Sequence, residues 1–218
     1  MKSAAIFANG VLNLSPAQCR EIRACDLIIA ADGGALHCRK LGILPQVVIG
    51  DFDSLISEEL TNLEADGAQL IRYPSHKDET DLELAFEFAR LQGCEQILLV
   101  GALGARWDMS IANILLAAHP TYADIQVRLA DDRQELLLLR SGKSYILHGK
   151  PGDTLSLIPI QGNVEGISTQ GLEYPLINEN LEFGSPRGVS NDFVTESAIV
   201  SLRKGLLICA MIHNGGNT

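Results

Sequence analysis

The chain has 218 residues and a formal net charge of −10, and 46% of its residues are hydrophobic. This length and composition are typical of a globular protein with one large domain or two modest ones. The excess of carboxylates argues against a nucleic-acid partner, because phosphate backbones are held by lysine and arginine. No apolar run reaches the roughly 18 residues that a membrane span needs. The first apolar stretch is short and broken by Asn9 and Gly10, so a cytoplasmic protein without a membrane partner is expected.

The chain has five cysteines, an odd number, and no two of them form a C-x-x-C pair. This pattern favours reduced thiols and argues against a structural zinc site. The acidic excess lies almost wholly within residues 1–132. Acidic side chains gathered in one region suit a magnesium site or a cationic ligand.

Residues 1–132 alternate between short apolar runs and helical patterns. The expected strands are Ala4–Ala8, Leu27–Ala31, Val47–Ile49, Gln69–Ile71, Ile97–Val100 and Ile125–Leu129. Apolar residues at i, i+3, i+4 and i+7 predict helices over 82–89 and 111–118, and Gly42, Gly93 and Pro120 follow expected helix ends. Such alternation predicts an α/β domain with a parallel sheet covered by helices on both faces.

Residues 133–218 have a different rhythm, with short β-branched or apolar segments separated by glycine-containing turns. The expected strands are Glu135–Leu139, Ser144–Leu147, Thr154–Ile158, Val164–Ser168, Ala198–Leu202 and Leu206–Met211. No helical period interrupts them, so the pattern predicts an antiparallel β-sandwich or barrel. The last six residues, 213–218, are expected to fray.

Paired carboxylates follow the third expected strand, at Asp51 and Asp53. In an open parallel sheet, ligands bind beyond the carboxyl ends of the strands. Two like charges at this spacing repel each other, and a loop has no structural need for both. A divalent cation relieves the repulsion, and oxygen ligands favour magnesium or calcium. The pair therefore predicts a metal site.

The second expected strand ends in Asp32, Gly33 and Gly34. The glycines allow a tight turn and let a ligand approach the backbone at a helix N-terminus. The alternative is a plain strand–helix turn in which Asp32 caps the helix.

The fourth expected strand leads to an acidic helix start. Thr80 and Glu83 fit a capping box, and Asp81 would be stabilised by the helix dipole. Asp78, next to Lys77, has no such structural explanation, although the segment taken alone indicates only a good helix start.

The fifth expected strand ends in a glycine-rich segment in which Gly104 could cradle phosphate and Arg106 could bind its oxygens. The alternative is that Asp108 caps the next helix. Neither a G-x-G-x-x-G fingerprint nor a P-loop is present. Four such segments on one edge of one sheet nevertheless predict a single site for magnesium and phosphate chemistry.

In order and spacing, these segments resemble those of thiamine pyrophosphokinases, and the resemblance covers nearly the whole chain. The matching segments are Ala31–Ala35, Pro45–Ser54, Lys77–Asp81, Gly101–Asp108 with Asn113, Gly171–Leu176, Gly188–Asn191 and Ser201–Ile208. The Gly-Asp-Phe-Asp-Ser and Lys-Asp-x-Thr-Asp motifs are specific, whereas the glycine-rich pieces are supportive.

The resemblance implies an α/β domain at 1–132 for ATP and Mg²⁺, followed by a β-sandwich at 133–218 for thiamine. It implies transfer of pyrophosphate from ATP to the thiamine hydroxyl, with AMP as the leaving group. It also implies a homodimer in which each site combines the α/β domain of one chain with the sandwich of the other.

The resemblance also assigns roles to residues. Asp51, Asp53 and Asp81 match the magnesium and phosphate carboxylates, and Asp32, Asp78 and Asp108 match further acidic positions of the site. Other expected ATP contacts are Gly33, Gly34, Lys77, Gly104 and Arg106. Ser190 and Asn191 match the thiamine-binding turn, and Tyr174 or Phe183 could stack on the thiamine rings. The alternative for these two aromatic residues is a place in the sandwich core.

One departure concerns the position after Asp108, where bacterial members commonly have histidine and this chain has Met109. Methionine cannot take up a proton, so either the histidine is dispensable or the substrate is altered. Trp107 is also bulkier than the usual residue. The proton acceptor could be Asp78 or Asp108.

Three other functions can be weighed against this one. An aspartyl phosphatase of the haloacid-dehalogenase type shares the Asp-x-Asp pattern, but position 55 is leucine and the motif follows the third strand. A pyrophosphokinase of the same fold acting on a pterin alcohol is a closer alternative. A non-catalytic sensor of thiamine or nucleotide is the third, with Met109 as its only support.

Overall fold

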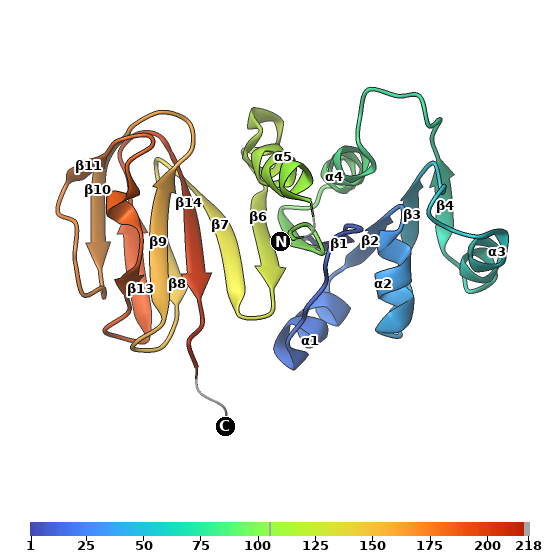
Figure 1. Ribbon diagram of the computed structural model, residues 1–218, viewed down its shortest axis with the longest axis horizontal. Coiled ribbons are helices and arrows are strands. Elements are labelled where there is room, and N and C mark those ends of the chain that lie inside the picture. Colours follow the sequence, from blue (N-terminus) through green and yellow to red (C-terminus); the bar gives the residue numbers. More distant parts are fainter. Residues whose placement is uncertain (105, 216–218) are drawn as a thin grey trace. The chain divides into compact units, whose positions relative to one another are not determined.

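The computed structural model describes residues 1–104 and 106–215 (Figure 1). Ala105, within the glycine-rich segment, and the last three residues of the tail lie outside the described residues. The chain divides into two compact units, Met1–Asp132 and Arg133–Thr218. Across the described part, no helix is both long and apolar enough to span a membrane.

The first unit is a parallel sheet with helices on both faces. Its strands are β1 (Ser3–Phe7), β2 (Leu27–Ala31), β3 (Val47–Gly50), β4 (Gln69–Arg72), β5 (Gln96–Val100) and β6 (Gln126–Asp131). Their order across the sheet is β6-β5-β1-β2-β3-β4, and each neighbouring pair is parallel. The helices are α1 (Pro16–Ala24), α2 (Gly34–Lys40), α3 (Ser57–Ala65), α4 (Asp81–Leu91) and α5 (Trp107–Ala118), with a 3₁₀ turn η1 (Pro120–Tyr122).

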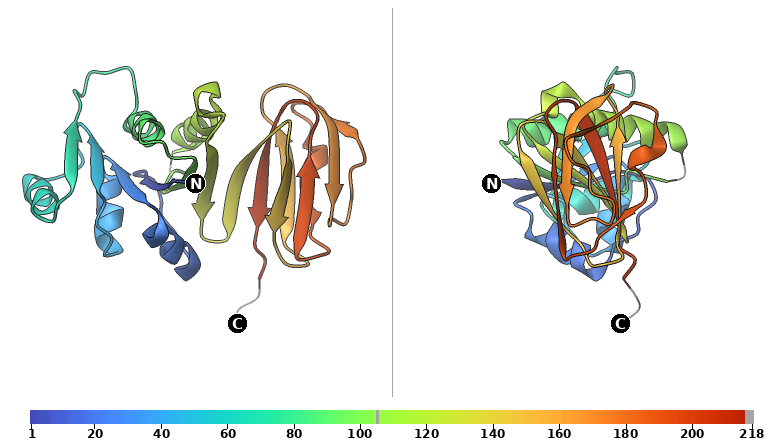
Figure 2. Two further views of the ribbon diagram at one scale, coloured as in Figure 1. Left: turned by 180° about the vertical axis from the view of Figure 1, so that it is seen from behind. Right: turned by 90° about the vertical axis from the view of Figure 1, so that its left-hand side faces the viewer.

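The two faces of this sheet bury alternate residues of its strands. α1 and α2 lie on one face and α4 and α5 on the other (Figures 1 and 2). On the first face, Phe7, Ile22 and Cys38 share a core with Leu60 and Leu63 of α3. The buried side of α4, which includes Leu82 and Phe86, packs on the opposite face against β1, β2 and β3. The α/β prediction is confirmed.

The second unit is an antiparallel sandwich. Its strands are β7 (Gln134–Arg140), β8 (Ser144–His148), β9 (Thr154–Pro159), β10 (Val164–Gln170), β11 (Glu179–Leu181), β12 (Asn191–Asp192), β13 (Ser197–Ser201) and β14 (Leu206–Ile212), with a 3₁₀ turn η2 (Pro186–Gly188). The strands form two layers, β12-β9-β14-β7 and β11-β10-β13-β8. Between the layers lies an apolar core that includes Leu139, Leu155, Ile167, Phe193 and Val200. This architecture confirms the predicted sandwich.

The expectation that the tail frays is wrong for its first two residues. His213 and Asn214 continue beyond β14 and hydrogen-bond to the buried carboxylate of Asp153. The sequence gives no sign of this anchor, because the partner lies sixty residues upstream.

Candidate active site

A cavity of about 520 Å³ opens at the carboxyl edge of the parallel sheet. The strand order reverses between β1 and β5, and segments that follow both strands line the cavity. Such a reversal is where open α/β sheets bind ligands, because the connections on either side run apart. The lining residues are Ala8, Asn9, Gly10, Ala31, Asp32, Asp51, Ser75, Lys77, Glu79, Thr80, Asp81, Leu82, Gly101, Ala102, Arg106, Met109 and Asn113.

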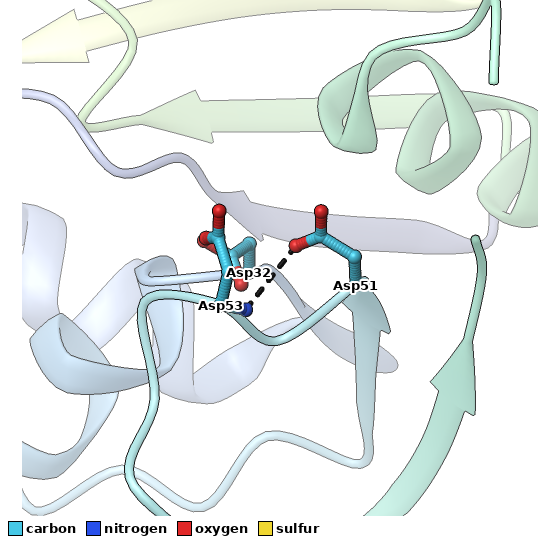
Figure 3. Close-up of side chains that lie close together, drawn as sticks. All are labelled: Asp32, Asp51 and Asp53. Atoms are coloured by element: carbon cyan, nitrogen blue, oxygen red, sulfur yellow. Dashed lines mark hydrogen bonds between the residues drawn. The ribbon is translucent and has the colours of Figure 1, made fainter. Parts of the chain in front are cut away.

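Three carboxylates gather at this edge, from the ends of β2 and β3. One oxygen from each of Asp32, Asp51 and Asp53 can be chosen so that all three lie within 4.8 Å of one another (Figure 3). Asp51 Oδ1 also accepts a hydrogen bond from the Asp53 amide at 3.2 Å. Asp53 Oδ1 accepts one from the Ser54 hydroxyl at 3.2 Å. The arrangement suits a divalent cation that prefers oxygen ligands.

Asp32 is the buried member of this group, with only 8% of its surface exposed. Its backbone has a φ of +44°, a left-handed conformation that non-glycine residues seldom adopt. Oδ1 of Asp32 has no hydrogen-bond partner among the described residues. A buried carboxylate without a partner is costly, and a cation beside it would remove that cost. The oxygen donors present therefore fit magnesium.

Gly50 lets two strand ends come together. A Cβ at this position would lie 3.0 Å from the Asp32 Cβ and 3.3 Å from the Asp81 Cγ. Any side chain here would press on both acidic residues. Because Gly50 has no side chain, Asp81 at the start of α4 can lie beside the carboxylates that follow β2 and β3.

Asp81 forms an ion pair with Lys77, whose Nζ lies 2.8 Å from its Oδ1. Burial raises the pKa of the Asp81 carboxyl above its ordinary value, and the charges of Asp32 and Asp51 add to this in spite of Lys77. Burial lowers the pKa of Lys77, but the hydrogen bond and charge of Asp81 outweigh it, so that pKa is raised. The ammonium group of Lys77 thus partly neutralises an acidic site.

Asp51 has the opposite shift. The hydrogen bond from the Asp53 amide, followed by one from Ser75, lowers the pKa of the Asp51 carboxyl. Its backbone carbonyl accepts a hydrogen bond from Arg72 Nη1 at 3.0 Å. The Asp51 carboxylate is therefore ionised at neutral pH, and the Arg72 bond to its backbone carbonyl holds the residue in place.

Arg106 and Asp108 pair with each other at the start of α5, where Arg106 Nε lies 3.2 Å from Asp108 Oδ1. Both are exposed, and Arg106 lowers the pKa of the Asp108 carboxyl. Gly104 donates its amide to the Ser110 hydroxyl at 3.1 Å, so that amide is already used. Met109 lines the cavity, whereas Trp107 is 84% exposed.

The cavity does not take in every predicted residue. Asp32, Asp51, Lys77, Asp81 and Arg106 line it. Among the site residues predicted in the first unit, those that do not line it are Gly33, Gly34, Asp53, Asp78, Gly104 and Asp108. Asp78 is exposed in the loop between β4 and α4.

Asn9 also lines the cavity, although it is not among the site residues predicted from the sequence. It follows β1, and a Cβ on Gly33 would lie 2.3 Å from its side-chain amide. A Cβ on Gly34 would meet the Phe7 carbonyl oxygen at 2.1 Å. The two glycines thus allow the loop after β2 to pack on the end of β1. The signal for Asn9 in the sequence is its place just after the first expected strand, since ligands bind beyond the carboxyl ends of parallel strands.

A second, smaller cavity of about 200 Å³ lies in the sandwich unit. Tyr174, Ser190 and Asn191 all line it, together with Arg187 and Val189. Ser190 has a φ of +61°, and its amide donates to the buried Ser156 hydroxyl at 3.0 Å. Phe183 is 61% exposed and does not belong to the sandwich core. The three predicted substrate-side residues are therefore neighbours.

The sequence matches known families over both units. A family model described as the thiamin pyrophosphokinase catalytic domain matches residues 19–129, and one described as its vitamin B1 binding domain matches 144–207. The thiamine pyrophosphokinase of Bacillus subtilis is 30% identical over 208 residues, which is 95% of this chain and 97% of that protein. The chain belongs to the thiamin pyrophosphokinase family.

Solved structures of thiamin pyrophosphokinases agree with this assignment. The crystal structure of the Bacillus subtilis enzyme superposes with a TM-score of 0.87 at 28% identity, covering 98% of this chain and 100% of that one. The Enterococcus faecalis family member gives a TM-score of 0.83 at 26% identity, covering 99% and 100%. Among plant relatives, thiamine pyrophosphokinase 1 of Oryza sativa is 28% identical over 78% of this chain and 67% of that protein.

Proposed function

We propose that this protein is an ATP-dependent thiamine pyrophosphokinase, which transfers pyrophosphate from ATP to the thiamine hydroxyl and releases AMP. Family membership supports this activity. The structural observation that carries it is the convergence of Asp32, Asp51 and Asp53 at the carboxyl edge of the parallel sheet, beside the large cavity. Carboxylates gathered at such an edge support the binding of a cation and of the phosphates that the reaction requires.

We propose that Asp51 and Asp53 are direct ligands of Mg²⁺. Asp32 and Asp81, on either side of Gly50, complete the negative site around them. A bound magnesium ion would supply charge neutralisation for the phosphates of ATP. The pKa of Asp51 is lowered, so this carboxylate is already ionised for that purpose.

Lys77 and Arg106 are proposed to bind phosphate oxygens. Both line the large cavity, and each is paired in this structure with a carboxylate, Asp81 or Asp108. An arginine fork and a lysine ammonium are the usual protein donors to phosphate. Their ion pairs hold the two cations at the cavity, where a phosphate would share or replace the carboxylate partners.

The sandwich cavity is proposed to hold thiamine. Tyr174 and Phe183 are both exposed, at 70% and 61%, and so can offer a ring face to a cation. The thiazolium of thiamine carries a positive charge, which suits the face of an aromatic ring.

We further propose that the protein works as a homodimer in the cytoplasm. Trp107, Ile111 and Leu115 are spaced four residues apart on α5 and are 84%, 59% and 52% exposed. They form an apolar stripe on one side of a helix whose single ionisable residue is Asp108. Such a stripe would let two acidic chains approach each other. All five cysteines are free thiols, which suits a reducing compartment.

The experiment that tests this function is a measurement of AMP release from ATP and magnesium. Thiamine, a hydroxymethylpterin and no acceptor are compared with the same protein. Rapid AMP release is expected when thiamine is the acceptor, and not with the pterin or without an acceptor. Release with the pterin would instead identify the related pyrophosphokinase, and thiamine binding without release would identify a sensor.

A further inference from the structure

The residues that follow β14 are tied to a buried acidic group in the sandwich unit. Asp153 is 4% exposed and precedes β9. Its Oδ2 accepts from the Lys150 amide at 2.9 Å and lies 3.1 Å from His213 Nδ1. Its Oδ1 accepts from the Asn214 amide at 2.9 Å. The contacts of His213 and Asn214 hold the end of β14 to the start of β9, and the Lys150 bond closes the turn before β9.

The Asn214 side chain extends this network toward β12. Its Nδ2 donates to the Gly152 carbonyl at 2.9 Å and to Thr154 Oγ1 at 3.0 Å. The Thr154 hydroxyl in turn donates to Asp192 Oδ1 at 3.3 Å. Thr154 pairs with Asp192 on one side and with Ile212 on the other, so it links β12 to β14.

The strand reached in this way is only two residues long, Asn191–Asp192. Its sheet pairing is limited to Leu155 and Thr154, and on its other side the Asp192 carbonyl accepts from the Glu173 amide at 2.9 Å. Yet it ends the turn that lines the sandwich cavity and carries the left-handed Ser190. A short edge strand that must hold a strained turn needs support from side chains.

We propose that Asn214 and His213 are positioning residues for the thiamine-side turn at Ser190–Asn191, acting through Asp153, Thr154 and Asp192. This inference rests on the proposed binding of thiamine at the sandwich cavity. The two residues do not line that cavity, so they act on the ligand only through the turn. The final segment of the sandwich thereby becomes part of substrate recognition.

The test compares Asn214→Ala with wild type and with Asn180→Ala. Asn180 is the control, since its side chain likewise hydrogen-bonds to the backbone of this unit, accepting from the Gly166 amide at 3.0 Å, and it takes part in none of the bonds described above. His213→Ala is compared with His213→Asn, whose amide can replace the Nδ1 donor to Asp153. Thiamine affinity is measured by calorimetry, and KM and kcat by AMP release.

Asn214→Ala is expected to weaken thiamine binding about fivefold, with kcat and the KM for ATP within twofold of wild type. His213→Ala should behave in the same way, and His213→Asn should restore the affinity. In the Asn191→Ala background, Asn214→Ala should add little, because both act through one turn. Amide hydrogen exchange should become faster at Ser190 and Asn191 in Asn214→Ala but not in Asn180→Ala.

Unchanged thiamine affinity and unchanged exchange at the turn in Asn214→Ala would overturn the inference. So would an equal loss of affinity in Asn180→Ala, which would show only a general loss of stability. If wild type itself neither binds thiamine nor releases AMP with it, the proposed function fails instead. The exchange measurement needs no substrate, and it still decides whether Asn214 holds the turn.

Discussion

The side-chain amide of Asn191 bridges both backbone groups of Tyr174. Asn191 Oδ1 accepts from the Tyr174 amide at 3.0 Å, and Asn191 Nδ2 donates to the Tyr174 carbonyl at 2.7 Å. Oδ1 also accepts from the Asp192 amide at 3.0 Å. The side chain is thus largely occupied within the protein, and its main effect is to fix the exposed tyrosine at the edge of the sandwich cavity.

Replacing Asn191 with alanine should therefore weaken thiamine binding by about tenfold, or ~1.4 kcal/mol, through loss of a fixed Tyr174. The KM for ATP should stay near its wild-type value. Asn191→Asp keeps the acceptor but loses the donor, so an intermediate effect is expected. Steady-state kinetics with each substrate varied in turn would check this, and an equal rise in both KM values would contradict it.

The metal proposal predicts that Asp51→Asn and Asp53→Asn each abolish turnover while the fold stays intact. Each substitution removes a charged oxygen from a site that gathers like charges. Turnover is measured across a magnesium titration, with circular dichroism as the check on folding. Asp124→Asn, an exposed acidic position outside the cavity, is the control for the change in net charge. Near wild-type rates at limiting magnesium would rule out the assignment.

The methionine that replaces the usual histidine gives a third prediction. Met109 lines the cavity, so Met109→His places an imidazole there. Thiamine turnover should stay within about tenfold of wild type, or ~1.4 kcal/mol, because under the metal proposal magnesium and its carboxylates, and not residue 109, supply the main electrostatic stabilisation. Side-by-side kcat/KM values for thiamine and a hydroxymethylpterin would check it. A much larger gain for either substrate would show that Met109 limits or selects the reaction.

The anchor at Asp153 predicts a pH dependence of stability. Burial alone would raise the pKa of this carboxyl, but hydrogen bonds from Lys150, His213 and Asn214 outweigh it and hold the pKa below its ordinary value of 3.8. A lowered folded-state pKa means that the folded state binds fewer protons than the unfolded state. The carboxylate therefore contributes stability above about pH 4 and loses it as the pH falls through the folded-state value.

Asp153→Asn should accordingly lower the free energy of unfolding by about 1–3 kcal/mol at pH 7, and by less at pH 3. Urea denaturation of both proteins at the two pH values gives the comparison. If the difference in free energy of unfolding between wild type and variant were the same at both pH values, the ionised form of Asp153 would not be the stabilising one.

The homodimer proposal can be tested by mixing two inactive variants. Asp51→Asn removes a proposed magnesium ligand, and a second variant has Ser190 and Asn191 replaced by bulky residues. If two copies share their sites, refolding the variants together makes mixed dimers with one intact site each. Random pairing makes about half of the dimers mixed, so activity should return to about a quarter of wild type. Mixed dimers that form but stay inactive would place each site within one chain.

Much of the parallel sheet was predictable, because its buried strands are continuous apolar runs with glycines after the helices. The predicted run 97–100 and the observed β5 differ by one residue, and Gly93 follows α4 as expected. The two-residue strand β12 was not predictable, since its pairing depends on Thr154 and Leu155 and not on its own composition. Short edge strands of this kind are defined by their neighbours.

At the site, the rule that ligands bind beyond the strand ends predicted that Asp51, Lys77 and Asp81 lie together, and all three line one cavity. The rule could not predict which of these side chains form an ion pair. The ion pair between Lys77 and Asp81 depends on the path of the loop into α4. The approach of Asp32 to Asp51 depends on a left-handed backbone at Asp32, which a side-chain pattern does not reveal. The direction of the Asn191 amide likewise follows from tertiary packing.

The position of β1 between β2 and β5 has a consequence for how the binding site is assembled during folding. β1 to β4 come from the first 72 residues, so the three clustered carboxylates can be brought together by the early part of the chain. The other wall of the cavity, Gly101 and Ala102, follows β5, which must insert beside a strand made some ninety residues earlier. Parallel pairing over such a separation carries a loop-closure cost and is intrinsically slow. A nascent chain that ends before β5 therefore carries its mutually repelling acidic groups at the end of an incomplete sheet, and the large cavity forms only when β5 is in place.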